Sequence, residues 1–137
     1  GMDERPLARA ASGGELSRIM LALKAELARH DAIPTLVFDE VDQGVGGHVA
    51  GRVAAALERV AADHQVLVIT HLPQVAAVAT RHLLVAKAAS GGTVLADVRV
   101  ISGAERVEEV TRMLGGERAP AAARKHAEEL LRRGDGS

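Results

Sequence analysis

Three carboxylates follow directly after a short apolar run in the first third of the chain. The run is Thr35 to Phe38, and the acids are Asp39, Glu40 and Asp42. An uninterrupted apolar run of this length predicts a strand buried on both faces of a parallel sheet, and open α/β sheets place their ligands at the carboxyl ends of strands. There the Asp of an Asp-Glu pair can hold Mg²⁺ and the Glu can polarise an attacking water. If the acids stood alone, solvated loop residues would be the preferred interpretation.

A second pattern lies at the start of a helix that is predicted over residues 14–30. Four small or polar residues open it: Ser12, Gly13, Gly14 and Glu15. A helix amino terminus after two glycines offers unobstructed backbone N–H groups and a positive dipole end, which suits an anion, and the serine adds a hydroxyl donor. Taken alone, this pattern would indicate only a capped helix.

His71 completes the set. It follows a second apolar run, residues 65–70, which is predicted to be another buried strand. At that position its ring can donate to a phosphate oxygen. Taken alone, a histidine in a turn would not indicate a phosphate site. The order and spacing of the three patterns together favour a site for phosphate, magnesium and water.

The remaining chain alternates between helical and strand periodicity. Helices are predicted over residues 47–62, 73–80, 105–114 and 120–133, and strands over residues 82–88 and 93–101. Ser90-Gly91-Gly92 between these last two strands is a hairpin-turn sequence. The other histidines show no metal-ligand spacing and are expected at the surface. They are His30, His48, His64, His82 and His126.

The composition is that of a globular domain. The chain has 137 residues, of which 47% are hydrophobic and 26% charged, and its net charge is −1. This length suits one modest domain, and the charge balance provides no global attraction to nucleic acid or membrane. There is no cysteine, which fits a reducing cytoplasm, and no apolar run approaches the ~20 residues of a membrane span.

Together these motifs resemble the carboxyl-terminal half of an ATP-binding-cassette (ABC) ATPase head. SGGE matches the signature motif, LVFDE the Walker B motif, DQGVGG the D-loop position and ITH the switch-histidine motif. Within that superfamily the sequence is most similar to the RecN family of SMC-like bacterial DNA repair proteins. ASGGELSR, THLPQVA and RMLGG narrow the resemblance to that family, and it covers roughly residues 6–131.

The resemblance implies two contacts across a dimer of heads. The signature residues would grip the γ-phosphate of ATP bound to the opposing head; they are Ser12, Gly13 and Gly14, with Glu15 nearby. Asp42 would lie in the D-loop and touch the partner head. The D-loop here, VDQGVGG, is richer in glycine than in most cassettes.

The resemblance also implies roles for three residues within one head. Asp39 would hold Mg²⁺ through water, and Glu40 would be the general base or water-orienting residue. His71 would contact the γ-phosphate of the nucleotide on its own head. These assignments make ATP and Mg²⁺ the expected cofactors.

One part of the nucleotide site is missing from this sequence. No GxxxxGK[ST] occurs, so nothing supplies the Walker A lysine and phosphate cradle. In the family's layout that motif lies near the amino terminus of the full protein, beyond a long coiled coil. Residues 1–137 are therefore expected to be the carboxyl-terminal lobe of a head, which should not hydrolyse ATP without the Walker A-bearing amino-terminal half.

The expected fold is α/β: half of an ABC/SMC-type P-loop ATPase head, with a parallel sheet flanked by helices, a β-hairpin and two terminal helices. In ATPases of this class the strands at residues 35–39 and 65–70 are neighbours. The Walker A strand would lie beyond the second of these, so that residues 65–70 and 82–88 should not pair directly. The chain alone is therefore expected to be marginally stable, with unpaired strand edges.

The expected function is that of a part of an ATPase in DNA double-strand-break repair and recombination. ATP would drive homodimerisation of the heads, and the full-length protein would act on DNA ends in the bacterial cytoplasm, associated with the nucleoid and without a membrane. One alternative is a half-head that binds nucleotide or a partner without hydrolysis. Another is the cassette of a different ABC ATPase such as a transporter, which Glu15 disfavours because transporters usually carry Gln there.

Overall fold

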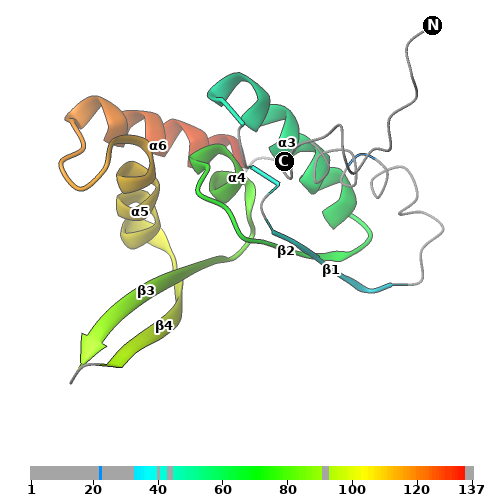
Figure 1. Ribbon diagram of the computed structural model, residues 1–137. Helices are drawn as coiled ribbons and strands as arrows, with labels where there is room; N and C mark the ends of the chain where they lie inside the picture. Colours follow the sequence, from blue (N-terminus) through cyan, green and yellow to red (C-terminus); the bar gives the residue numbers. More distant parts are fainter. Residues whose placement is uncertain (1–21, 23–32, 40, 43–44, 91–92, 135–137) are drawn as a thin grey trace, which may run out of the picture. The chain divides into compact units, whose positions relative to one another are not determined.

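The computed structural model describes residues 22, 33–39, 41–42, 45–90 and 93–134 (Figure 1). The chain forms two compact units, residues 1–75 and 76–137, and the boundary falls within α4. In chain order the elements are β1 (Thr35–Phe38), α3 (Gly47–Ala61), β2 (Gln65–Val68), α4 (Pro73–Val78), β3 (His82–Ser90), β4 (Thr93–Ile101), α5 (Gly103–Gly115) and α6 (Ala121–Gly134). This mixture of strands and helices confirms the α/β class. Ala22 is helical, and the rest of the helix predicted over residues 14–30 lies outside the described residues.

The first unit is built on a parallel pair of strands. β1 and β2 align in register from Thr35 beside Gln65 to Phe38 beside Val68, as predicted for these neighbours. Backbone hydrogen bonds extend the ladder at both ends, since Gln65 N–H donates to the Pro34 carbonyl and Ile69 N–H to the Phe38 carbonyl, each at 2.9 Å. The parallel arrangement brings the carboxyl ends of both strands to the same edge.

Helix α3 connects the two strands and contacts β2. Its buried side chains recur at helical spacing and form one apolar face: Ala50, Val53, Ala54, Leu57 and Val60. The exposed Gly46 precedes the helix in an extended conformation, and its carbonyl accepts the first helical hydrogen bonds from Val49 and Ala50. The predicted boundaries of this helix agree with the structure to within one residue.

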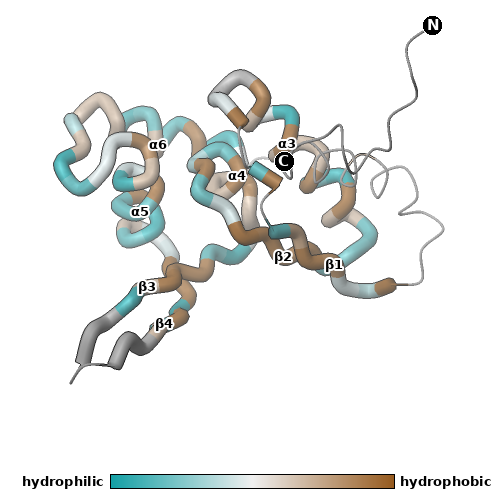
Figure 2. The backbone as a smooth tube through the Cα atoms, viewed as in Figure 1, coloured by the Kyte–Doolittle hydropathy of each residue, from teal (hydrophilic) through white to brown (hydrophobic). Residues whose placement is uncertain are grey.

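The prediction that these strands are buried on both faces is wrong. Leu36 and Phe38 are buried, but the alternate side chains are exposed, with Val37 at 66%, its neighbour Leu67 on β2 at 41% and Ile69 at 61%. Successive side chains of a strand point to opposite faces, and in the described part of the chain only one face is covered. Figure 2 shows the hydrophobic colouring that continues along both strands.

The second unit contains an antiparallel hairpin. β3 and β4 pair continuously from His82 beside Ile101 to Ser90 beside Thr93, so the predicted hairpin is confirmed and β3 extends two residues beyond its predicted end. Among the described strands, β3 pairs with β4 alone and β2 with β1 alone, as expected for strands that are not direct neighbours.

Helices α5 and α6 pack against each other in the second unit. Four buried residues form the centre of this packing: Ala77, Val110, Ala127 and Leu131. Helix α5 ends at Gly115, and the next residue, Gly116, has a φ of 73°, which favours glycine because a Cβ would be strained there. The two terminal helices are confirmed, with boundaries within two residues of those predicted.

The histidines that were expected at the surface do not all lie there. His64 is buried, and its Nδ1 lies 2.8 Å from the Ile33 carbonyl oxygen, which ties the segment after α3 to the start of β1. His82 is partly buried, and of the described members of this set only His126 is exposed as predicted. His30 and the side chain of His48 lie outside the described residues. Within the described ranges, no helix has both the length and the apolar character needed to cross a membrane.

Candidate functional site

The parallel pairing of β1 and β2 brings two of the predicted site residues together. Asp42 lies four residues after β1, and His71 lies three residues after β2. Although they are far apart in the sequence, Asp42 Oδ2 and His71 Nδ1 are 3.0 Å apart. The acidic segment and the histidine segment therefore meet at the carboxyl edge of the strand pair, where open α/β sheets place ligands.

Asp42 is held by several donors at once. Its side chain is only 5% exposed. Oδ2 accepts a hydrogen bond from the Thr70 hydroxyl at 2.5 Å and another from the backbone N–H of His71 at 2.8 Å. The Thr70 hydroxyl in turn accepts from the Leu72 N–H at 3.0 Å. These bonds fix the carboxylate against the turn that follows β2.

The electrostatics of this cluster favour a charged Asp42. Burial alone would raise the pKa of its carboxyl group, because removing a charge from water is costly. The hydrogen bonds from Thr70 and from the His71 N–H, together with the charge of the His71 ring, act in the opposite direction. Together they outweigh burial, and the pKa of Asp42 is lowered.

The His71 ring contacts Asp42 through one nitrogen, and most of the side chain is exposed to solvent. One ring nitrogen faces the buried Asp42, yet the side chain is 72% exposed. The ring is thus oriented on one side and accessible on the other. Thr70, to which the sequence analysis assigned no role, belongs to this cluster; its position directly before His71 at the end of an apolar run was the available signal.

The other predicted site residues are placed less fully. Asp39 follows β1 directly and is exposed. Five residues lie outside the described part of the chain: Ser12, Gly13, Gly14, Glu15 and Glu40. Among the residues that are described, no three acidic or histidine side chains gather as a ready-made metal site.

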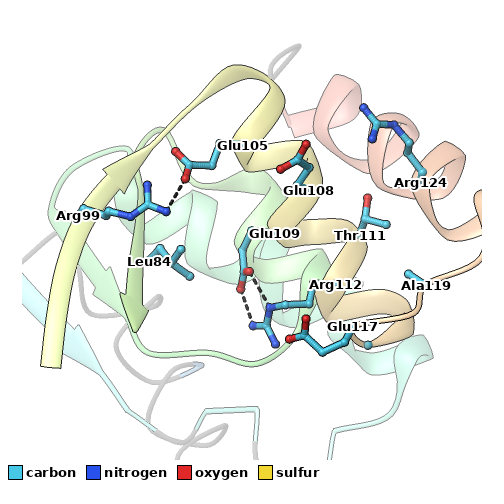
Figure 3. A pocket seen from close by; sticks show the side chains of 11 residues that line it. Leu84, Arg99, Glu105, Glu108, Glu109, Thr111, Arg112, Glu117, Ala119 and Arg124 are labelled. Atoms are coloured by element: carbon cyan, nitrogen blue, oxygen red, sulfur yellow. Dashed lines mark hydrogen bonds and ion pairs between the residues drawn. The ribbon is translucent and has the colours of Figure 1, made fainter. Parts of the chain in front are cut away.

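The second unit contains a shallow hollow of about 410 Å³ beside α5, which the sequence analysis did not predict (Figure 3). Its lining is largely charged, and four of the charged residues form two ion pairs. Arg99 pairs with Glu105, and Arg112 pairs with Glu109 through two hydrogen bonds of 2.6 and 2.7 Å. Three arginines and four glutamates line the hollow, so charges of both signs are present and the hollow has no strong preference for a charged ligand.

Comparison with known proteins agrees with the motif resemblance. No model of a protein family matches the chain. The DNA repair protein RecN of Streptomyces coelicolor is 53% identical over 131 residues, which are 96% of this chain and 23% of that protein. RecN of Mycobacterium leprae is 53% identical over 96% of the chain and 22% of its own length, and RecN of Bacillus subtilis is 44% identical over 96% and 23%. The resemblance to RecN is confirmed.

The match to RecN has a defined extent. The chain spans less than a quarter of the length of these RecN proteins. A continuous match over 96% of the chain necessarily includes the segment from Asp39 to His71, together with most of the second unit. The cluster at the carboxyl edge of β1 and β2 therefore lies within the region shared with RecN.

Proposed function

We propose that the chain is part of the head of an SMC-like ATPase that acts in bacterial DNA double-strand-break repair and recombination. It supplies the signature motif, Walker B, D-loop and switch histidine for ATP-driven dimerisation and hydrolysis. The observation that carries the proposal is the meeting of Asp42 with Thr70 and His71, because it joins the acidic and histidine motifs at one strand edge. The relatives' name, DNA repair protein RecN, supports the cellular role.

In this proposal each motif residue has a chemical task. Asp39 is an exposed carboxylate at the end of β1, which fits Mg²⁺ because that ion takes one or two carboxylates together with water and phosphate oxygens. When bound, the ion would neutralise charge on the phosphates. Glu40 orients the attacking water, and His71 donates to the γ-phosphate. Ser12, with the glycines after it, binds the γ-phosphate on the opposing head.

The site requires a second polypeptide segment for completion. This sequence lacks a Walker A motif, and the chain is under a quarter as long as its RecN relatives. The exposed apolar side chains of β1 and β2 offer a surface on which such a segment could pack. An amino-terminal half that carries Walker A would both bind the nucleotide and cover this face.

The proposal is tested by mixing the chain with the Walker A-bearing amino-terminal fragment of the parent protein and measuring ATP hydrolysis. We expect turnover by the mixture and none by the chain alone. Glu40→Gln should leave ATP binding intact and slow hydrolysis on the order of 10²-fold, as loss of a positioned base does. ATP-bound dimers should then accumulate and be visible by light scattering.

Three results would contradict this assignment. Turnover by the pure chain that Glu40→Gln abolishes would show that Walker A is not needed. Normal turnover by the variant in the mixture would remove Glu40 from its role. Saturable ATP binding by the mixture without any hydrolysis would instead support a regulatory binding module.

A further inference from the structure

We propose that Asp42 is a positioning residue that holds the His71 ring through Nδ1 and thereby presents Nε2 to a phosphoryl oxygen. The proposal rests on the ATPase function above for the identity of that ligand. It departs from the expected D-loop role, in which Asp42 reaches toward a second head. In the structure this side chain turns inward instead, and its Oδ2 lies 3.0 Å from His71 Nδ1 within the same chain.

The identity of the proton donor follows from the chemistry of Asp42. An ionised carboxylate can only accept hydrogen bonds. Asp42 Oδ2 already accepts from the Thr70 hydroxyl and the His71 N–H, as an ionised carboxylate oxygen does, so we place the proton of its 3.0 Å contact with the ring on Nδ1. A carboxylate opposite one ring nitrogen is a common device for fixing both the tautomer and the orientation of a functional histidine.

The geometry leaves the opposite nitrogen for a ligand. With Nδ1 directed to a side chain that is 5% exposed, Nε2 lies on the outer side of a ring that is 72% exposed. In the protonated ring both nitrogens donate, so the imidazolium can bridge the Asp42 carboxylate and a phosphate oxygen. Such a bridge places positive charge between two anions, which stabilises all three groups.

Asp42 is itself held firmly enough to act as an anchor. The Thr70 hydroxyl and the His71 backbone N–H both donate to the oxygen that faces the ring, at 2.5 and 2.8 Å. Both donors belong to the turn after β2, so the carboxylate moves with that turn. The ring is thereby positioned by the same strand that delivers it to the sheet edge.

The tautomer of His71 provides a direct test. Ring nitrogen shifts of the nitrogen-15-labelled chain, alone and with the amino-terminal fragment, should show a protonated Nδ1 and a bare Nε2 in the neutral ring. Asp42→Asn should return the ring to the Nε2–H form that free histidine prefers, because an amide N–H can donate to a bare Nδ1. The matched control Thr70→Val removes a bond to Asp42 but leaves the ring contact, so the Nδ1–H form should persist. Exposed His126 serves as the internal reference.

Two results of this test would overturn the proposal. One is an Nε2–H tautomer in the unmodified chain, a measurement that holds even if the variants fail to fold. The other is an unchanged tautomer in Asp42→Asn when its amide spectrum shows the native fold.

Kinetics of the reconstituted head separate positioning from mere structural support. Asp42→Asn and His71→Ala should each lower kcat by about 10²-fold with little change in KM, as loss of a directed donor to the reacting group does. The double variant should be no slower than the slower single variant, since residues that act as one unit are not additive. Additive losses would refute the proposal. If the unmodified mixture shows no turnover, the proposed ATPase function fails, while the tautomer measurement still decides the role of Asp42.

Discussion

Arg106 offers the most quantitative test of how the second unit is held together. The guanidinium Nη2 of this α5 residue donates to three backbone carbonyls at the end of α4, those of Ala76, Ala77 and Ala79, at 3.3, 3.0 and 2.6 Å. The last carbonyls of a helix have no partner within the helix. A cation at this position therefore satisfies them and also interacts favourably with the helix dipole.

The magnitude follows from these contacts. Replacing Arg106 by Met keeps an apolar stem of similar size but removes every donor. A hydrogen bond that involves a charged group contributes about 1.5–3 kcal/mol, and the three carbonyls share one nitrogen, so their bonds are not independent. Ala76 and Ala77 are buried, which makes water a poor substitute for the lost donor. We therefore expect Arg106→Met to lower the opening free energy of the second unit by about 2–3 kcal/mol.

Native-state amide hydrogen exchange measures this quantity locally. The N–H of Val110, whose side chain is completely buried, should exchange about 30- to 150-fold faster in Arg106→Met. Arg118→Met is the matched control, because Arg118 is exposed in the turn between α5 and α6. A change for Arg106→Met that is no larger than the change for Arg118→Met would refute the argument, since it would mean that the carbonyls find equivalent partners in water.

Two further predictions concern the same unit. A Cβ on Gly134 would clash with the backbone oxygen of Ala77, which cannot rotate away. Gly134→Ala should therefore lower the free energy of unfolding by about 1–3 kcal/mol in thermal or denaturant unfolding. The control Gly51→Ala in α3, with open space around the new Cβ, should be neutral or stabilising, and equal effects of the two variants would contradict the packing argument. Burial, together with the nearby charge of Arg106, lowers the pKa of His82 from its ordinary 6.5. The unfolded chain therefore binds the proton more readily, and stability should fall as the pH drops from 6.5 through the folded pKa. His82→Gln should flatten this dependence of stability on pH in denaturant titrations, and an unchanged dependence would exclude His82 as its source.

Local structure was largely predictable from the sequence because its signals are local. The apolar spacing along residues 47–62 predicted α3, which spans Gly47–Ala61. The Ser90-Gly91-Gly92 sequence predicted the hairpin, whose register joins Ser90 to Thr93 across two residues. The helix predicted over residues 105–114 is α5, which ends at Gly115 before Gly116 with its positive φ. Strand ends were less predictable, since they depend on where the pairing partner ends.

Burial was harder to predict because it depends on what covers each surface. The apolar run from Thr35 to Phe38 indicated burial on both faces, yet Val37 is 66% exposed. Apolar side chains on both faces of the strand predict a sheet that is covered on both sides, whereas the described residues cover only one side. His64 shows the opposite case: nothing in its spacing distinguished it from a surface histidine, but its contact with the Ile33 carbonyl makes it part of the interior.

The sequence by itself determined which chemical groups are present and in what order, and this was enough to predict the α/β class and the resemblance to RecN. It could not determine the direction in which Asp42 points. Only the parallel pairing of β1 with β2 brings Asp42 to Thr70 and His71, which lie 28 and 29 positions further along the chain. The buried carboxylate then turns inward because the Thr70 hydroxyl and the His71 N–H replace the hydrogen bonds that it gives up in water.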